Sequence, residues 1–391
     1  MDKVFPRYYK PVTGMDDPVV HTEHWDLAKE AFDEKKYKQA VLEVIRFVNS
    51  KALEGVDTSG EVDITGYQGS AQMNIHVDDD VFRVKAPFLK ITDGTNKVAL
   101  LRKIAEINFS AMSLAQIVRH DRRLCFEYEM PVALAQPNKV YDILWEVSVN
   151  ADKYDDLLIN HFGADFVMAP SKKELTPEES REVRWQIEQL FEDFRQIMDY
   201  FVRHRHEDYK WELSAITLLK FSNMPYVHGQ LRTDLINEIS QMFDSDISFD
   251  YRADRAARYV KKLMETPIEE LFENIYHAPQ FVSLRWRMTE DIIAERLKNY
   301  VQTVETNHQK ERLMYQYYYL KIIFHKLIYD YNLEKDYLEA IQHTLVAVNG
   351  KDYEEAVPLL EELFYKMLNK KLKPQAKPKS KGGFFSRLFN G

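Results

Sequence analysis

Apolar and polar side chains alternate in three stretches between residues 61 and 162, and this period of two predicts strands with one buried face. The alternating apolar residues are Met73, Ile75 and Val77, then Phe82, Val84 and Ala86, then Leu124, Phe126, Tyr128 and Met130. A charged turn at residues 121–123 separates the third stretch from residues 114–118, Leu-Ala-Gln-Ile-Val, which are mostly apolar. We therefore expect an antiparallel hairpin here, which Pro131 ends because proline lacks a backbone donor.

Two helical stripes accompany these strands. Residues 93–96 offer turn and N-cap chemistry before the first stripe, and Pro137 precedes the second. The stripes consist of Val98, Leu101, Ile104 and Ala105, and of Val140, Leu144, Val147, Ala151, Tyr154 and Leu158. The predicted order of elements is helix, three strands, helix, hairpin, helix.

Outside this region the periodicity is helical. Apolar residues within 25–48 predict a helical hairpin, and residues 170–370 predict a bundle or an irregular array of helices. The start signal Thr-Pro-x-Glu occurs at Thr176 and again at Thr266, where threonine caps the helix and proline takes the first helical position. Breaks in the helical region are expected near residues 223–225, 243–246 and 277–279.

The fold class that follows is α+β and mostly helical. It combines an α/β unit, in which an antiparallel sheet packs on helices, with a large all-α domain. The chain has 391 residues, 45% of them apolar, which is enough material for two or three cores. The predicted segments are a helical hairpin at 1–55, the α/β domain at 56–165, the all-α domain at 171–369 and a basic disordered tail at 370–391.

Four segments of the α/β unit carry a family resemblance. They are Ala86-Pro87-Phe88-Leu89, the helix end Glu106-Ile107-Asn108-Phe109, the hairpin strand Cys125-Phe126-Glu127-Tyr128-Glu129, and Ala151-Asp152-Lys153-Tyr154-Asp155. Residues 61–162, roughly a quarter of the chain, thereby resemble the YbjN family, whose fold is that of type III secretion chaperones. The resemblance implies a chaperone-like unit that holds a partner polypeptide on a sheet or groove surface, with a homodimer as an implied assembly. It brings no catalytic motif.

Helical hairpins near both ends resemble part of a tetratricopeptide unit. Residues 37–41, Tyr-Lys-Gln-Ala-Val, match residues 353–357, Tyr-Glu-Glu-Ala-Val, and a polar turn precedes each tyrosine. The two segments are 316 residues apart, whereas a solenoid needs about three adjacent units. Plain helical packing is therefore the favoured interpretation, and a small peptide-binding groove is the alternative.

Cysteine content and charge narrow the functional class. The single cysteine, Cys125, excludes an intramolecular disulfide framework and fits a reducing compartment. The sequence shows neither a secretory signal nor a membrane span, so we expect a cytoplasmic protein. The formal net charge is −9, and the seven Lys or Arg of residues 370–391, with no acid among them, leave −16 for the remainder. An acidic body is a poor non-specific binder of nucleic acid, so no nucleic-acid partner is predicted.

Candidate catalytic chemistry is sparse. The standard phosphate-binding, metalloprotease and hydrolase motifs are missing from the sequence, so no cofactor, metal ligand or catalytic residue is assigned. His204 and His206 diverge on a helix, which favours a solvated helix end over a metal site. Glu273 and His277 have the spacing of a metal pair but lack a third ligand, so a surface position is favoured. Cys125 lies on the polar side of its strand, where it could be exposed, and is interpreted as an inert thiol.

An aromatic cluster between residues 315 and 331 has two interpretations. It contains Tyr315, Tyr317, Tyr318, Tyr319, Phe324, Tyr329 and Tyr331. A helix that is apolar nearly all round is usually the central buried helix of a bundle, which we favour although Lys321, His325 and Lys326 interrupt the run. An aromatic-lined ligand pocket is the alternative.

The tail joins a basic linker to an apolar terminus. Lysine and proline recur up to Lys381, which predicts an extended linker, and Phe385, Leu388 and Phe389 fall on one side of a short helical turn. The candidate partner-binding residues are Lys379, Lys381, Phe384, Phe385, Arg387, Leu388 and Phe389. Docking to a protein is favoured; weak peripheral membrane contact, packing against the chain's own domain, or no role are the alternatives.

Two functional classes follow. The leading one is a non-enzymatic, chaperone-like or adaptor-like protein that binds a protein or peptide partner on its α/β and helical domains and docks through its tail. The alternative is an enzyme or small-molecule sensor that uses an aromatic-lined cavity in the helical domain. Buried charged side chains converging in a deep pocket would favour the second class, and a broad exposed apolar groove would favour the first.

Overall fold

Two hydrophobic cores organise the protein, one around a sheet and one inside a helical region. The computed structural model describes residues 5–12, 18, 23–69, 71–168 and 172–372. The fold is α+β and mostly helical, which confirms the predicted class. Within the described residues, no helix combines the length and the hydropathy that crossing a bilayer requires.

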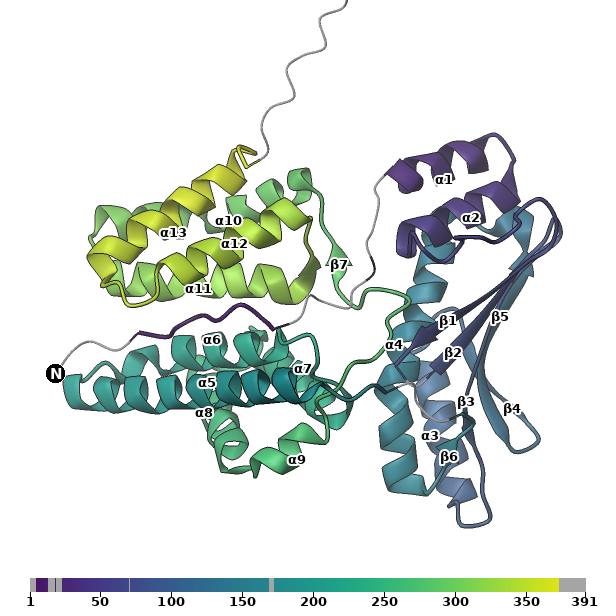
Figure 1. Ribbon diagram of the computed structural model, residues 1–391, viewed down its shortest axis with the longest axis horizontal. Helices are drawn as coiled ribbons and strands as arrows, with labels where there is room; N and C mark the ends of the chain where they lie inside the picture. The colour runs from purple at the N-terminus through teal and green to yellow at the C-terminus, as the bar shows by residue number, and fades with distance from the viewer. Residues whose placement is uncertain (1–4, 13–17, 19–22, 70, 169–171, 373–391) are drawn as a thin grey trace, which may run out of the picture.

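An antiparallel sheet in the order β1-β2-β3-β5-β4 forms the α/β unit (Figure 1). The residues that alternate in the sequence point into its core, and Met73, Val84 and Phe126 are fully buried. The predicted hairpin is formed by β4 and β5, with Val118 opposite Cys125. The strands are β1 (Val62–Gln68), β2 (Ala71–Val77), β3 (Val81–Lys90), β4 (Gln116–His120) and β5 (Arg123–Pro131), and the short β6 (Asp165–Phe166) pairs with β3.

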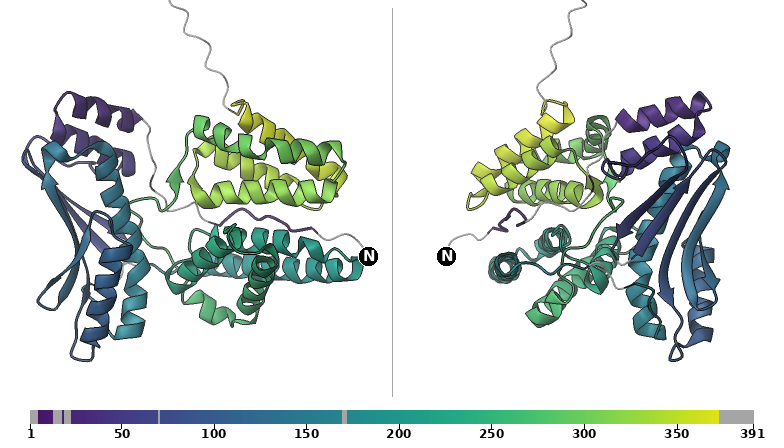
Figure 2. Two further views of the ribbon diagram at one scale, coloured as in Figure 1. Left: turned by 180° about the vertical axis from the view of Figure 1, so that it is seen from behind. Right: turned by 45° about the vertical axis from the view of Figure 1, so that its right-hand side comes forward.

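Helices cover one face of this sheet (Figure 2). They are α3 (Lys97–Ser110) and α4 (Pro137–Phe162), and α1 (Glu23–Asp33) and α2 (Tyr37–Val48) pack beside α4. The side chain of Asn96 accepts a hydrogen bond from the backbone of Ala99 at 3.3 Å, so the predicted cap of α3 is present. The other face of the sheet carries polar side chains, including the ion pair of Arg83 with Glu129 at 2.5 Å.

The helical region has two layers of helices (Figure 1). The first layer comprises α5 (Pro177–His204), α6 (Lys210–Ser222), α7 (Gly229–Phe243), α8 (Phe249–Glu265) and α9 (Ile268–Phe272). The second comprises α10 (Glu290–Gln309), α11 (Leu313–Asp330), α12 (Lys335–Ala347) and α13 (Tyr353–Leu368). Two 3₁₀ turns (Val132–Leu134 and Glu207–Tyr209) and a parallel pair of two-residue strands, β7 (Trp286–Arg287) and β8 (Tyr331–Asn332), complete the elements. All three expected breaks fall between helices.

The two Thr-Pro-x-Glu signals have different outcomes. Thr176 caps α5 in a full capping box, in which its side chain accepts from the backbone of Glu179 and the Glu179 carboxylate accepts from the backbone of Thr176. Thr266 instead ends α8, and its hydroxyl donates to the carbonyl of Lys262 at 2.9 Å. The helix that follows Thr266 is the five-residue α9, which has no side-chain cap. The second prediction was therefore right about a helix start and wrong about the cap.

The aromatic segment is the buried helix α11, as favoured from the sequence. Tyr317, Tyr318 and Phe324 are fully buried between α6, α10 and α13. Lys321 and His325, which interrupt the apolar run, are fully buried as well. These two interruptions therefore do not mark a solvent-facing side of the helix, whereas the third, Lys326, is partly exposed.

The loop 279–282 of the helical region enters the core of the α/β unit. The Gln68 side-chain oxygen accepts from the backbone of Phe281 and of Val282, both at 3.0 Å. A side chain at Gly66 would collide with the Phe281 ring, since a Cβ there would lie 2.3 Å from a ring carbon. The glycine in β1 thus allows the close approach of the two units.

Candidate polypeptide-binding site

The N-terminal segment, defined here as Phe5–Val12, lies between the two helical layers (Figure 1). The sequence assigned these residues to a unit with the helical hairpin, yet Phe5 and Tyr8 are buried in the core of the helical region. The segment forms no helix and pairs with no strand. Its backbone polar groups must therefore be satisfied by side chains of the surrounding helices.

Two buried lysines bind successive carbonyl groups of this segment. Lys321 Nζ on α11 donates to the carbonyl oxygen of Pro6 at 2.5 Å, and Lys220 Nζ on α6 donates to that of Arg7. The two helices belong to opposite layers, so the lysines approach the backbone from both sides.

Amide side chains bind the next part of the segment. Asn349, between α12 and α13, accepts from the backbone N–H of Tyr8 at 2.9 Å and donates to its carbonyl at 2.8 Å. One side chain thereby reproduces the paired hydrogen bonds that a neighbouring strand would supply. Gln186 on α5 donates to the carbonyl of Lys10 at 3.1 Å.

The side chain of Arg7 is 38% exposed, but its guanidinium is bound by the buried carboxylate of Asp193. Its Nε and Nη2 donate to Asp193 Oδ1 at 2.9 and 2.5 Å, and its backbone N–H donates to Asp193 Oδ2 at 2.9 Å. Gln189, also on α5, accepts from Nη2 at 3.0 Å. The hydrogen bond to Asp193 raises the pKa of Arg7, which keeps the guanidinium charged.

Aromatic rings anchor both ends of the segment. The Phe5 ring lies edge-on to Tyr353 and Tyr317, with centroids 4.9 and 5.8 Å away. The Tyr8 ring is 5.5 Å from the imidazole of His325. Tyr9 packs edge-on against Trp185 at 4.7 Å. The site therefore offers aromatic surface on both sides of the Arg7 pocket.

Burial weakens the positive charge of the bases that surround the segment. It lowers the pKa of Lys220 to about 8 and holds the pKa of Lys321 and of His325 well below their ordinary values. Both ring nitrogens of His325 are buried and lack a hydrogen-bond partner. Buried ionisable groups that converge in this way are a feature expected of an enzyme. Here, however, the backbone of the N-terminal segment occupies the space between them.

The histidines and the cysteine considered above do not form a centre. His204 Nδ1 faces the carbonyl of Tyr200 at 2.9 Å at the end of α5, and His277 Nε2 lies 3.3 Å from Glu179 Oε1. Cys125 faces the polar side of the sheet but is buried, in contrast to the exposure that the strand pattern allowed. Burial raises the pKa of its thiol to about 12.

A carboxylate and histidine cluster that the sequence did not indicate lies on the sheet. Pairing of β1 with β2 brings Asp63 opposite His76, and one ligand atom each from Glu61, Asp63 and His76 lie within 4.8 Å of one another. Partial burial lowers the pKa of His76, but hydrogen bonds to Asp63 and Asp78 raise it overall. His76 and the neighbouring acids Glu61, Asp63 and Asp78 therefore form a surface network of histidine–carboxylate contacts.

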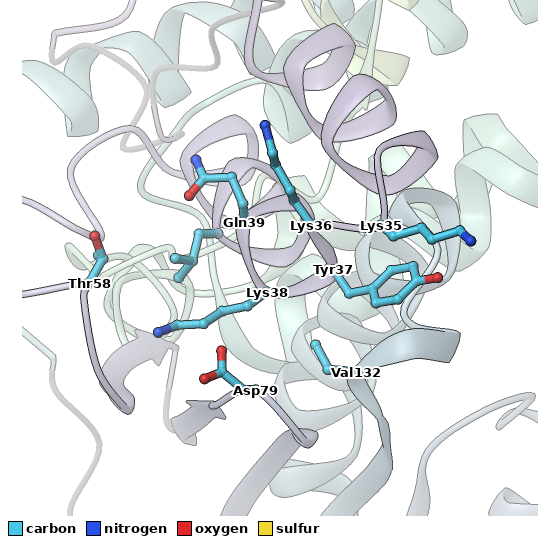
Figure 3. A pocket seen from close by; sticks show the side chains of 9 residues that line it. Lys35, Lys36, Tyr37, Lys38, Gln39, Thr58, Asp79 and Val132 are labelled. Carbon is cyan, nitrogen blue, oxygen red and sulfur yellow. The ribbon is translucent and has the colours of Figure 1, made fainter.

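A lysine-lined pocket lies beside the turn between α1 and α2 (Figure 3). Its lysines point in different directions: Lys38 extends toward Asp79, and Lys35 and Lys36 extend away from it. Lys36 pairs with Glu34 at 2.7 Å, and Lys38 donates to the carbonyls of Ser59 and Gly60. The three cations therefore do not converge on one anion.

The candidate tail residues Lys379, Lys381, Phe384, Phe385, Arg387, Leu388 and Phe389 lie outside the described residues. The described residues that precede them include Leu372, which packs against the helical core. Comparison with protein-family models finds no match to this chain, and no curated protein matches it either.

Proposed function

We propose that this protein binds polypeptides without catalysing a reaction, and that its ligand lies extended between the two helical layers. The observation that carries the proposal is the set of side chains that hold the backbone of the N-terminal segment, namely Lys321, Lys220, Asn349 and Gln186. Backbone contacts accept an extended peptide of almost any sequence, as in strand-addition sites. The N-terminal segment is then the resident ligand of the site.

The side-chain contacts give this site a preference. Asp193 and Gln189 fit a guanidinium, and the Tyr317–Tyr353 surface fits an aromatic ring two residues earlier. The residue after the arginine faces the His325 ring, which favours a second aromatic side chain. The preferred ligand is an extended peptide with the pattern aromatic-x-Arg-aromatic.

The same geometry argues against an enzyme at this position. Catalysis requires space for a substrate beside the reactive groups. The carbonyls of Pro6 and Arg7 accept the hydrogen bonds of the two buried lysines, and Asp193 is engaged by Arg7. The buried charges are therefore explained as binding partners of a backbone.

The other parts of the chain have supporting roles in this proposal. The α/β unit, with its resemblance to the YbjN family and type III secretion chaperones, offers a second, chaperone-like surface and a basis for a homodimer. The tail docks to a protein partner in a cytoplasmic setting. The resemblance and the tail composition support these roles.

Selection of peptides by the vacant site tests the proposal. A variant lacking residues 1–12 is exposed to a displayed library of linear nine-residue peptides, with the full-length chain as the matched control. We expect the variant to enrich peptides with an arginine flanked by aromatic residues and the full-length chain to enrich far fewer. A variant that is folded by circular dichroism yet enriches no such pattern would contradict the proposed function.

A further inference from the structure

A second cavity, of about 330 Å³, lies where the α/β unit meets the helical region. Helix α4 supplies one wall, α7 and α11 supply another, and the segment 284–286 closes the side between them. The lining residues are Trp145, Val149, Lys153, Ser222, Arg232, Thr233, Ile236, Asn237, Leu284, Arg285, Trp286, Tyr329 and Asp330. Cavities of this size at domain junctions are the usual places for small ligands.

Two indole rings, one from each unit, form an aromatic wall of this cavity. Trp145 on α4 and Trp286 stack with centroids 5.0 Å apart and planes 26° apart. Trp286 is 52% exposed, which leaves ring surface open for a further planar group. The indole N–H of Trp145 is buried and has no hydrogen-bond partner. A buried donor without an acceptor destabilises the folded protein, and a ligand that accepts its hydrogen bond would remove this cost.

Positive charge gathers in this cavity although the chain as a whole is acidic. Lys153, Arg232 and Arg285 line it, against the single acid Asp330. The Asp330 carboxylate is already paired with Lys326 at 2.7 Å. Within the described part of the chain, the guanidinium of Arg232 forms no hydrogen bond or ion pair. The cavity therefore offers the guanidinium of Arg232 to an anion that the protein itself does not supply.

Two of these cations, Arg232 and Arg285, act electrostatically on Tyr329, which also lines the cavity. Burial raises the pKa of its phenol to about 12, and the nearby charges of Arg232 and Arg285 act in the opposite direction. Arg232 on α7, Tyr329 on α11 and Arg285 in the segment 284–286 all line this cavity. The aromatic wall and the cationic side face one ligand-sized space.

We propose that this cavity binds a small planar aromatic carboxylate. Its ring would stack on the exposed face of Trp286, and its carboxylate would accept hydrogen bonds from Arg232. Because the lining comes from both units, such a ligand would hold α4 against α7. The inference is independent of the polypeptide site, which uses different residues.

Calorimetric titration of the full-length chain with three matched probes tests this inference. The probes are 2-naphthoate, which has both the ring and the anion, 2-naphthylmethanol, which has the ring alone, and cyclohexanecarboxylate, which has the anion without an aromatic ring. We expect 2-naphthoate to bind at least about tenfold more tightly than either of the others. Equal affinities for the three probes, or no binding of 2-naphthoate, would overturn the proposal.

Variants then locate the bound probe. Arg232→Gln and Trp286→Ala change partly or largely exposed side chains, so both variants should fold, which thermal unfolding checks. Each is expected to weaken 2-naphthoate binding by about tenfold or more. Arg181→Gln and Phe109→Ala, both at exposed positions outside the cavity and the polypeptide site, are the matched controls and should leave the affinity unchanged. Binding that survives both cavity substitutions would assign the probe to another place and overturn the proposal.

Discussion

Asp193 links the buried charges of the helical region. It is 2% exposed, binds Arg7 through both carboxylate oxygens and lies near Lys220. Removal of one partner from a buried charge network leaves the other charges uncompensated. The residue is thus a determinant of stability as well as of the binding preference.

Substitution of Asp193 by Asn should therefore be costly. We expect the free energy of unfolding to fall by about 1–3 kcal/mol, because Asp193 is buried whereas the Arg7 side chain is 38% exposed and keeps part of its hydration. Asp199→Asn, at an exposed position of the same helix, is the control and should change it by less than about 0.5 kcal/mol. Urea unfolding followed by circular dichroism measures both. If both substitutions changed the free energy of unfolding by the same amount, Asp193 would not be the determinant of stability described here.

Glu212 on α6 makes stability depend on pH. Burial raises the pKa of its carboxyl to about 7, and one carboxylate oxygen is buried without a partner. The folded state therefore prefers the protonated acid. The contribution is fully present below the ordinary pKa of about 4.5 and is lost as the pH rises to 7.

Glu212→Gln should flatten this dependence. Between pH 4.5 and 7 we expect the free energy of unfolding of the parent to fall by about 1–3 kcal/mol relative to the variant. Denaturant unfolding across that pH range provides the measurement, with Glu188→Gln, at an exposed position on α5, as the control. A parent and a Gln variant with parallel pH profiles would show that Glu212 does not titrate in this way.

At the scale of elements, the same start signal has two structural outcomes. Thr176 closes a capping box at the start of the long helix α5, whereas the Thr266 hydroxyl bonds backward to Lys262. Thr176→Ala should therefore lower the free energy of unfolding by about 1 kcal/mol, and Thr266→Ala by less than about 0.5 kcal/mol. Thermal or urea unfolding of the two variants measures both changes. A larger loss of unfolding free energy for Thr266→Ala than for Thr176→Ala would contradict the assignment of the caps.

Periodicity predicted most elements because burial itself is periodic. The alternation at Met73 and Phe126 and the stripe at Val140 follow directly from one buried face. Lys321 was not predictable as a buried residue, since its partner is the carbonyl of Pro6, 315 residues earlier. Cys125 was assigned to the correct face of its strand, but whether neighbouring side chains cover that face depends on tertiary packing.

The candidate site could not be predicted from the sequence for the same reason, because its residues come together only in the tertiary structure. The N-terminal segment has no regular period, and its partners come from α5, α6, α11 and the turn before α13. The sequence around each partner, such as Asn349 or Lys220, gives no sign that this polar residue binds a backbone. Only the packing of two helical layers around the segment gives these residues a shared role.

At the scale of the whole molecule, the two cores are joined by the loop that carries Phe281. The tail continues from α13 in the second helical layer, where Lys370 pairs with Asp291. The basic and apolar composition of residues 370–391 predicts docking that is separate from the folded body.

Removal of the tail tests that prediction. Affinity purification with the full-length chain is compared with a variant that ends at Asn369, and we expect a set of partners to be lost with the tail. A second variant, with Phe384, Phe385, Leu388 and Phe389 changed to Ser, keeps every cation of the tail. It therefore distinguishes binding through apolar side chains from binding through positive charge. Co-sedimentation with anionic vesicles measures the membrane alternative. An unchanged set of partners would refute the docking role.

The most direct test of the central claim is binding in trans. A fluorescent peptide with the sequence of residues 4–12 is titrated into a variant lacking residues 1–12 and followed by anisotropy. We expect saturable binding that is at least about tenfold weaker for the full-length chain and for a peptide in which Arg7 is replaced by Ala. Failure of the folded variant to bind the peptide, or equal binding of the Ala peptide, would contradict the account.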